Sequence, residues 1–176
     1  MSDKLRVGIL GGTGMVGQRF ISLLENHPWF EVVTVAASPR SAGKTYEDAV
    51  GDRWKMDTPM PEAVKNIVVM NVNEVEKVAS EVDFVFSAVD MTKDEIKKIE
   101  EEYAKTETPV VSNNSAHRWT PDVPMVVPEI NPEHMKVIEF QKKRLGTTIG
   151  FVAVKPNCSI QSYAPVLTAW KEFEPY

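Results

Sequence analysis

The chain has 176 residues, of which 43% are hydrophobic and 26% are charged, and this is enough to bury the core of one globular domain. Such a composition excludes an intrinsically disordered chain. The net charge of -5, together with the lack of a lysine or arginine cluster, argues against a nucleic-acid partner and favours a small-molecule ligand.

The sequence carries no recognisable targeting segment or membrane span. Residues 1–6 have mixed charges and lead directly into a strand pattern, unlike a signal or transit peptide. No apolar run approaches the roughly 18 residues that a membrane span needs. The one cysteine cannot form an internal disulfide or, by itself, a structural zinc site. We therefore expect a cytoplasmic protein with no membrane partner and no metal site.

Strand and helix patterns alternate along the chain. Residues 5–10 read as a buried strand, and apolar residues then recur at helical spacing from near Met15 to Pro28. Further strands are predicted at 31–37, 66–72, 84–88, 109–112 and 151–154, and further helices at 73–80, 92–105 and 132–143. The stretches between them are turn-rich at 38–61 and irregular at 114–131, where the chain should wrap the edge of the sheet. This order predicts an α/β fold: a doubly wound, mostly parallel Rossmann sheet with helices on both faces.

The pattern changes after the last predicted strand. Residues 1–155 are interpreted as the nucleotide-binding Rossmann domain, and residues 156–176 as the truncated start of a second, α+β catalytic and dimerisation domain. Pro165 should kink the helix expected there or delay its start. The apolar residues of this helix should be exposed in the chain as it stands; they are Tyr163, Val166, Leu167 and Trp170.

A glycine-rich loop joins the first predicted strand to the first helix. Starting at Gly12 it satisfies G-x-G-x-x-G, and Gly11 extends the motif. Glycines at these positions let backbone N–H groups approach a pyrophosphate at the positive end of the helix. The alternative is a tight turn that needs only glycine torsions. The predicted cofactor contacts in this loop are Gly12, Thr13, Gly14, Met15, Val16 and Gly17.

The end of the second predicted strand indicates which dinucleotide binds. NAD-preferring Rossmann folds place an Asp or Glu there, whereas residues 36–40 read Ala-Ala-Ser-Pro-Arg. Ser38 and Arg40 suit a 2'-phosphate through charge-assisted hydrogen bonds, so we predict NADP(H). The alternative is that Arg40 is a solvated loop cation. Ser87 and Ala88, at the end of a later strand, are small enough to let the dinucleotide pass close to the backbone.

Cys158 is the candidate nucleophile. A lone cysteine is more often a small buried hydrophobe. Cys158, however, follows a strand and lies directly after Asn157, at or near the start of a helix, where free N–H groups bind an oxyanion. A thiol placed there, beside a hydride carrier, is suited to forming a thioester from an acyl phosphate or a thiohemiacetal from an aldehyde.

Five segments together carry a resemblance to a known family. They are Gly-Gly-Thr-Gly-Met-Val-Gly, Ala-Ala-Ser-Pro-Arg-Ser-Ala-Gly-Lys, Val-Ser-Asn-Asn-Ser-Ala-His-Arg-Trp, Val-Pro-Glu-Ile-Asn and Pro-Asn-Cys-Ser. In this order they resemble aspartate-semialdehyde dehydrogenases, in particular the archaeal and fungal branch. The resemblance implies NADPH-dependent reductive dephosphorylation of 4-aspartyl phosphate to aspartate 4-semialdehyde, through a cysteine thioester, early in lysine, threonine, methionine and isoleucine biosynthesis.

The same resemblance implies roles for individual residues. Cys158 matches the nucleophile and Asn157 its neighbour in the motif, while Arg118, with Asn114 nearby, matches an arginine that binds substrate phosphate or carboxylate. The substrate contacts that the resemblance implies are therefore Arg118, Asn114 and Asn157. A surface arginine is the alternative for Arg118. The loop implied to hold the 2'-phosphate consists of Ser38, Arg40, Ser41 and Lys44.

The chain also departs from the family pattern. The family's acid/base histidine follows the cysteine in a second domain, whereas His27, His117 and His134 all precede Cys158. The resemblance therefore implies that this stretch alone lacks the catalytic histidine and is inactive, and that the full-length protein is a homodimer or homotetramer. The open alternatives are a malonyl-CoA reductase, an N-acetyl-glutamyl-phosphate reductase, or a non-catalytic nucleotide-binding fragment.

Overall fold

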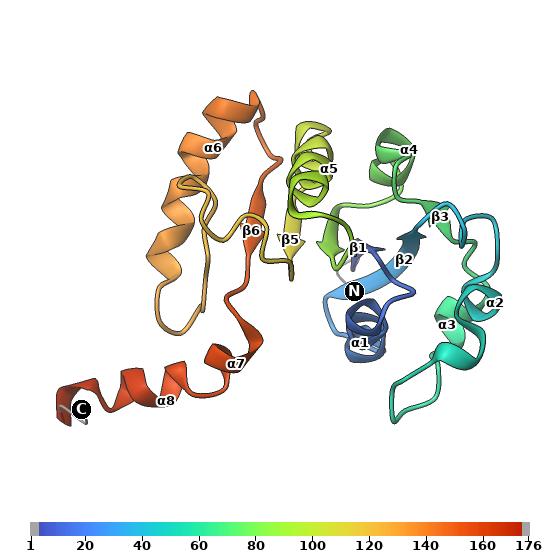
Figure 1. Cartoon of the computed structure of the whole chain (residues 1–176), viewed down its shortest axis with the longest axis horizontal. Helices are drawn as coiled ribbons and strands as arrows, with labels where there is room; N and C mark the ends of the chain where they lie inside the picture. Colours follow the sequence, from blue (N-terminus) through green and yellow to red (C-terminus); the bar gives the residue numbers. More distant parts are fainter. Residues whose placement is uncertain (1–3, 174–176) are drawn as a thin grey trace.

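The structure, a computed structural model, describes residues 4–173 and is built around one six-stranded sheet (Figure 1). The strands lie in the order β3-β2-β1-β4-β5-β6, and each neighbouring pair is parallel. Because the chain winds outward from β1 in both directions, the predicted doubly wound Rossmann sheet is confirmed. The strands are β1 (Leu5–Leu10), β2 (Phe30–Ala37), β3 (Met70–Asn71), β4 (Phe84–Ser87), β5 (Val110–Ser112) and β6 (Val152–Val154).

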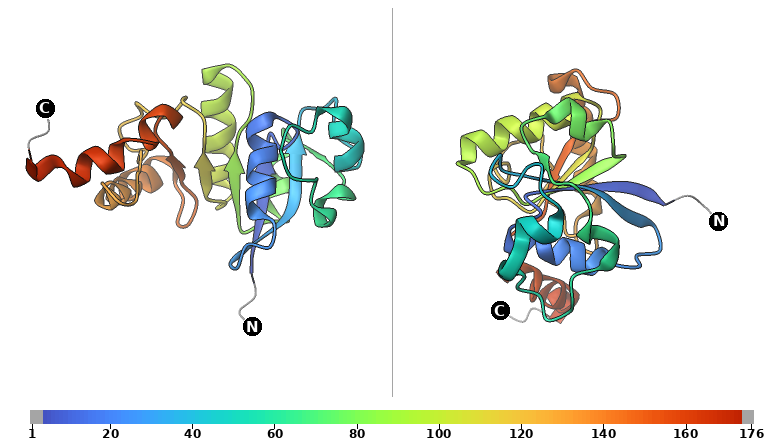
Figure 2. Two further views of the ribbon diagram at one scale, coloured as in Figure 1. Left: turned by 90° about the horizontal axis from the view of Figure 1, so that it is seen from below. Right: turned by 90° about the vertical axis from the view of Figure 1, so that its right-hand side faces the viewer.

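Helices cover both faces of the sheet, as the two views of Figure 2 show. One apolar cluster joins the sheet to α1 (Met15–Leu24), α2 (Tyr46–Val50) and α3 (Glu62–Lys65). A second cluster lies against α4 (Val75–Ala79) and α5 (Lys93–Lys105). The last long helix, α6 (Ile138–Leu145), contacts α5. The three layers place apolar side chains on both sides of the central strands, which explains their nearly continuous hydrophobic runs.

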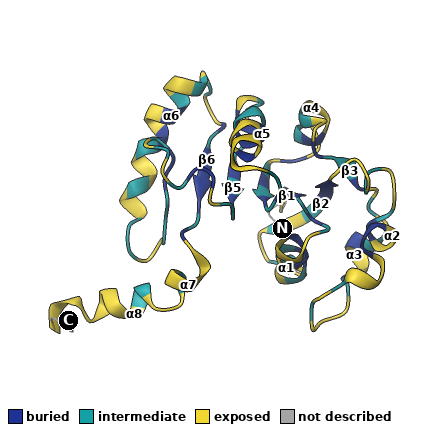
Figure 3. Ribbon diagram, in the orientation of Figure 1, coloured by how far each residue is buried: buried dark blue, intermediate teal, exposed yellow. Residues whose placement is uncertain are grey.

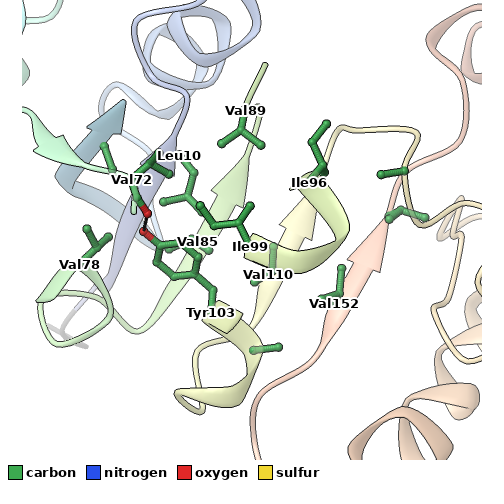
Figure 4. Close-up of a cluster of buried hydrophobic side chains, with 14 of the residues drawn as sticks. Leu10, Val72, Val78, Val85, Val89, Ile96, Ile99, Tyr103, Val110 and Val152 are labelled. Carbon is green, nitrogen blue, oxygen red and sulfur yellow. Dashed lines mark hydrogen bonds between the residues drawn. The ribbon is translucent and has the colours of Figure 1, made fainter. Parts of the chain in front are cut away.

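Helix α5 anchors the second cluster, which Figure 4 shows in close-up. Its start has the predicted capping box, with Thr92 as the N-cap and reciprocal hydrogen bonds to Glu95. Its buried face presents Ile99 and Tyr103 to the sheet. The Tyr103 hydroxyl donates a 2.8 Å hydrogen bond to the backbone oxygen of Val72, and burial raises the pKa of this phenol. One aromatic side chain therefore both fills the core and satisfies a buried carbonyl.

The segment between β2 and β4 differs from the prediction. The strand expected at 66–72 is reduced to the two residues of β3, because Val68 pairs instead in an antiparallel bridge with Thr45. That bridge folds the turn-rich stretch back on itself and accommodates α2, η1 (Gly51–Arg53) and α3, none of which was predicted. These elements are three to five residues long, too short to show a periodic pattern.

The irregular stretch 114–131 follows the outer edge of the sheet, as predicted. Val154 of β6 donates to the Pro124 oxygen at 2.9 Å and accepts from the Val126 N–H at 3.1 Å. The predicted helix at 132–143 is instead a 3-10 turn, η2 (Pro132–Val137), that leads into α6. From α6 the buried Gln141 exchanges hydrogen bonds with Val152 of β6. The edge strand is therefore paired along its free side.

After β6 the chain leaves the sheet through α7 (Cys158–Gln161), α8 (Ala164–Ala169) and η3 (Lys171–Phe173) (Figure 1). Pro165 lies in the first turn of α8, so the prediction of an interrupted helix is confirmed. Figure 3 shows that this segment is largely exposed. No helix within residues 4–173 is both long and apolar enough to cross a membrane. The division of the chain at residue 155 stays a prediction.

Candidate functional site

A cleft of about 480 Å³ opens where β1, β2 and β4 end. Because the strands are parallel, their carboxyl ends meet at one edge of the sheet, and the order of connections reverses between β1 and β4. This reversal point is where open α/β sheets bind ligands. The cleft brings together predicted residues from three connections, namely Thr13, Gly14, Ser38, Arg40, Ser41, Lys44 and Ala88.

The four glycines of the loop lack side chains for different structural reasons. Gly11 has a positive φ of 78°, and a Cβ there would lie 2.3 Å from the Ala88 oxygen. A Cβ on Gly17 would lie 2.4 Å from the Gly11 oxygen. Gly12 is buried against Val35. Gly14 is different, because it lines the cleft and a Cβ would meet only the Gly11 oxygen, at 3.4 Å. The first three glycines shape the loop, and Gly14 keeps the cleft side open.

The loop presents unused backbone donors at the start of α1. Within residues 4–173, the N–H groups of Thr13, Met15 and Val16 have no backbone acceptor. The N-cap residue Gly14 supplies no capping side chain, and the first turn of α1 contains no acidic residue. Free donors at the positive end of a ten-residue helix make a site for an anion such as a phosphate.

Two buried side chains hold this loop in place. The Tyr46 hydroxyl of α2 donates to the Gly12 oxygen at 2.9 Å, and burial raises the pKa of this phenol. The Gln18 amide of α1 donates to the backbone oxygens of Thr13 and Arg53, each at 3.0 Å, and accepts from the Lys55 N–H. Gln18 therefore ties the glycine loop to η1.

The charges around the cleft favour an anionic ligand. Arg40 and Lys44 lie on the connection after β2, as predicted, and Arg53 of η1 joins them, against one acidic lining residue, Asp90. Sequence reasoning missed Arg53, which lies in the turn-rich stretch without a motif of its own. The Arg53 side chain donates to the Ala49 oxygen, and its backbone is held by Gln18. Asp90 follows β4, and the end of β2, where a carboxylate would select NAD, contributes only Ala37, Ser38 and Arg40 to the described lining of the cleft.

Ser87 lies beneath the cleft rather than on its wall. It is fully buried, and its hydroxyl donates to Glu100 of α5 at 2.7 Å. The same Glu100 oxygen accepts from Ser112 at 2.6 Å and from the Asn114 side chain at 3.1 Å. The predicted contacts Ser87 and Asn114 are therefore joined in one buried network that fixes the ends of β4 and β5. The first residue of this connection to line the cleft is Ala88.

Cys158 begins α7, as predicted, and is exposed. Asn157 caps this helix, because its side-chain oxygen accepts the Ser159 N–H at 2.8 Å. The same oxygen lies 3.9 Å from the Cys158 sulfur. Asn157 therefore orients the residue that carries the thiol, a role that sequence reasoning had assigned only as substrate contact.

Arg118 is half-buried and points at the chain just before Cys158. Its guanidinium donates to the backbone oxygens of Lys155 at 3.2 Å and of Asn113 and Pro156 at 3.4 Å each. These bonds join the end of β5 to the end of β6. Arg118 is therefore not a free surface arginine, and the structure places it beside the cysteine loop.

The three histidines have local structural partners. His117 is buried, within 3.1 Å of the Thr120 hydroxyl and 3.3 Å of the Lys97 oxygen. His134 bonds the backbone of Met125, and His27 stacks on Phe30. Within residues 4–173, no group of three His, Cys, Asp or Glu side chains is arranged to hold a metal ion.

Comparison with known proteins places this geometry in a family. Residues 6–138 match the family described as semialdehyde dehydrogenase, NAD-binding domain. The chain is 46% identical to an aspartate-semialdehyde dehydrogenase of Methanothermobacter thermautotrophicus over 155 residues, which are 88% of this chain and 42% of that protein. An Aspergillus fumigatus aspartate-semialdehyde dehydrogenase is 44% identical over 89% of this chain and 42% of its own length. The chain thus spans less than half the length of these relatives.

A solved structure agrees with the sequence relatives. The crystal structure of Candida albicans aspartate-semialdehyde dehydrogenase with NADP superposes with a TM-score of 0.83 at 40% identity, covering 98% of this chain and 48% of that one. A Vibrio cholerae aspartate-semialdehyde dehydrogenase II structure gives a TM-score of 0.69 at 26% identity, covering 96% and 48%. The described part of the chain therefore has the fold of roughly the first half of these enzymes.

Proposed function

The chain belongs to the semialdehyde dehydrogenase family, and from that premise we propose that it is the NADP(H)-binding, nucleophile-bearing part of an aspartate-semialdehyde dehydrogenase. The proposed reaction is the reductive dephosphorylation of 4-aspartyl phosphate to aspartate 4-semialdehyde. One observation carries the proposal: a glycine-lined, cationic cleft and an exposed cysteine follow strands of the same parallel sheet, at its carboxyl edge.

The residues of the cleft fit an NADP(H) molecule. The open face of Gly14 and the free N–H groups of the loop suit the pyrophosphate. Ser38, Arg40, Ser41 and Lys44 suit the 2'-phosphate, since they combine hydroxyl donors with two positive charges. When bound, the cofactor supplies hydride-transfer chemistry.

In the proposed mechanism, Cys158 attacks the acyl carbon of 4-aspartyl phosphate. A sulfur–carbon bond forms, the carbon–oxygen bond to the phosphoryl group breaks, and hydrogen phosphate leaves with the thiol proton. Asn157 positions the thiol through the helix cap, and Arg118 lies where it can bind an anionic group of the substrate. With the cofactor bound, the thioester carbon would accept a hydride, the carbon–sulfur bond would break to release the aldehyde, and the Cys158 sulfur would take up a proton from solvent.

Cofactor preference tests the first half of the proposal. NADPH and NADH are titrated against the protein by calorimetry, and NADPH should bind at least about tenfold more tightly, because charge-assisted bonds to a phosphate are worth about 1.5–3 kcal/mol. Arg40→Ala should weaken NADPH binding by a similar factor and leave NADH binding unchanged. Equal affinities for both dinucleotides in the unaltered protein would sink the NADP assignment.

Acylation of the cysteine tests the second half. The protein is incubated with 4-aspartyl phosphate, and its intact mass is compared with that of Cys158→Ala. An aspartyl adduct on the unaltered protein alone is the expected result. Malonyl-CoA and N-acetyl-glutamyl phosphate serve as competing acyl donors, and faster labelling by either would replace the proposed substrate. No labelling by any donor would leave a nucleotide-binding protein without this chemistry.

A further inference from the structure

Two cationic side chains, those of Arg118 and Lys155, lie close together near Cys158. The Arg118 guanidinium and the Lys155 ammonium both donate to the backbone oxygen of Pro156, at 3.4 and 3.3 Å. Two nitrogens that share one acceptor are close neighbours. Pro156 lies two residues before Cys158 in the sequence, and the Lys155 ammonium is near enough to both Cys158 and Arg118 to interact with them electrostatically.

Neither cation has a carboxylate partner in the part of the chain that the structure describes. Among residues 4–173, Arg118 and Lys155 form no salt bridge, although several exposed lysines and arginines elsewhere do. Their hydrogen-bond partners are neutral: backbone oxygens for both, and the Gln161 side-chain oxygen for Lys155 at 3.3 Å. Both residues are also half-buried. Two positive charges held close together and partly out of water repel each other. A negatively charged ligand bound between them would remove this repulsion, so the pair favours an anion.

The electrostatics of Lys155 agree with this geometry. Burial lowers the pKa of the Lys155 ammonium, a nearby Cys158 thiolate raises it, and the positive charge of Arg118 lowers it. The largest of these effects disfavours the charged lysine. A bound anion would raise the pKa of Lys155 again, because it would replace the solvation that burial removes and would compensate the positive charge of Arg118.

We propose that Lys155 is a second phosphoryl-binding residue beside Cys158: it joins Arg118, which the resemblance already implies as a ligand for a substrate anion, and the two hold the phosphoryl group of the acyl phosphate as it leaves. This inference rests on the proposed function and adds Lys155, which neither the motifs nor the resemblance singled out. Two positive charges match a phosphoryl group, which carries close to two negative charges at neutral pH, better than they match a single carboxylate. Held there, the phosphoryl group departs from the carbon that the adjacent sulfur attacks, and the two cations stabilise the charge that develops on its oxygens.

Protection of the thiol by inorganic phosphate tests the site directly. Cys158 is alkylated with iodoacetamide, a neutral reagent, in rising concentrations of phosphate, with sodium chloride keeping the ionic strength constant. Phosphate should slow alkylation of the unaltered protein. The quantity compared between variants is the half-protecting phosphate concentration, because it does not depend on the intrinsic reactivity of the thiol.

Matched variants identify the role of Lys155. Lys155→Gln should raise the half-protecting phosphate concentration about tenfold, since a charge-assisted contact is lost. Lys155→Arg keeps the charge and should restore protection to within about threefold. Lys171→Gln, which removes an exposed lysine of η3, should behave like the unaltered protein. Thermal unfolding of each variant separates a lost contact from a lost fold.

Three results would overturn the inference. They are the absence of protection of the unaltered protein by phosphate, protection of Lys155→Gln at the same phosphate concentration as the unaltered protein, and protection by succinate as strong as that by phosphate. The last result would assign the site to a carboxylate of the substrate. The assay needs neither cofactor binding nor acylation. A failure of the proposed function therefore appears in the titration or labelling experiments, and a failure of this inference appears only here.

Discussion

Gly14 and Gly17 lack side chains for different reasons, and substitution can separate the two. Gly14 lines the cleft and has room for a Cβ, whereas a Cβ on Gly17 would lie 2.5 Å from the Gly12 Cα. Gly14→Ala should therefore keep the stability of the protein while weakening NADPH binding at least about tenfold, because the methyl group occupies the space of the pyrophosphate. Calorimetric titration and thermal unfolding of the same sample check both parts.

Gly17→Ala is the matched comparison for that experiment. The added methyl group must push the loop away from α1, so the free energy of unfolding should fall by about 1–3 kcal/mol, as for other overpacked sites. If Gly14→Ala bound NADPH as well as the unaltered protein does, the pyrophosphate would not lie against this glycine.

Glu100 accepts hydrogen bonds from three donors at the ends of β4 and β5. Its other oxygen is buried without a partner within residues 4–173. Glu100→Ala would leave the buried Ser87 and Ser112 hydroxyls without their acceptor and would remove one of the two acceptors of the Asn114 amide, so we expect a loss of about 3 kcal/mol in unfolding free energy. Glu102→Ala, on the same helix but in an exposed 3.9 Å ion pair, should change it by less than about 1 kcal/mol. Urea unfolding of both variants gives the comparison, and equal losses would show that the network contributes nothing.

Site residues that form a local pattern were predictable, and those brought in by tertiary contacts were not. The glycine loop and residues 38–44 each lie next to a strand end, so adjacent residues carry the signal. Arg53 reaches the cleft because Gln18 binds its backbone across 35 positions of sequence. Lys155 becomes a candidate site residue only because Arg118, 37 positions earlier in the sequence, folds against it and donates to its backbone oxygen. Ser87 was predicted to contact the cofactor because it is small and lies at the end of a strand. Its hydroxyl instead donates to the buried Glu100, a contact that the sequence does not reveal.

At the scale of elements, one glutamate joins the end of α5 to the segment before β6. The Glu107 carboxylate accepts the N–H groups of Thr148, Ile149 and Gly150 at 2.6–3.0 Å. These bonds, that of Gly150 foremost, lower the pKa of the Glu107 carboxyl from its ordinary value of 4.5. The folded protein therefore favours the ionised form, and β6, which leads to Cys158, is positioned in part by this charge.

The sign of this shift predicts a pH dependence. Because the folded-state pKa is lowered, the stabilisation is fully present above pH 4.5 and is lost as the pH falls below that value through the folded-state pKa. Glu107→Gln should lower the melting temperature by a few degrees at pH 7, and the difference from the unaltered protein should shrink as the pH falls below 4.5. Melting curves across this range provide the measurement. Glu81→Gln, which removes an exposed carboxylate, is the control, and a gap that stayed constant with pH would refute the assignment.

Elements with long periodic patterns were predicted well, and short ones were not. Helix α5 was correct to within a residue because its capping box and its apolar spacing agree. Strand 66–72 was wrong for most of its length, because its β-branched residues pair with the chain around Thr45 instead of extending β3. Residue type alone does not choose between two available partners.

At the scale of the whole molecule, the segment after β6 presents an apolar surface. The side chains of Tyr163, Val166, Leu167 and Trp170 are 49%, 48%, 37% and 55% exposed, and they lie close together in sequence on and around α8. Exposed apolar groups gathered in this way mark surfaces that associate. We expect the 176-residue chain to bind a hydrophobic dye and to increase in apparent mass with concentration.

A pair of double variants tests whether that surface is responsible. Val166→Glu with Leu167→Glu should reduce dye fluorescence by about half and abolish the concentration dependence of the apparent mass, because two of the four large apolar side chains become charged. Thr168→Glu with Ala169→Glu adds the same charge to the same helix while leaving the large apolar residues in place, and should retain most of the dye binding. The melting temperature should be unchanged in both, since these side chains are exposed. Equal loss of dye binding in the two variants would attribute the effect to charge alone, whereas loss confined to the first would identify α8 as the surface through which this chain associates.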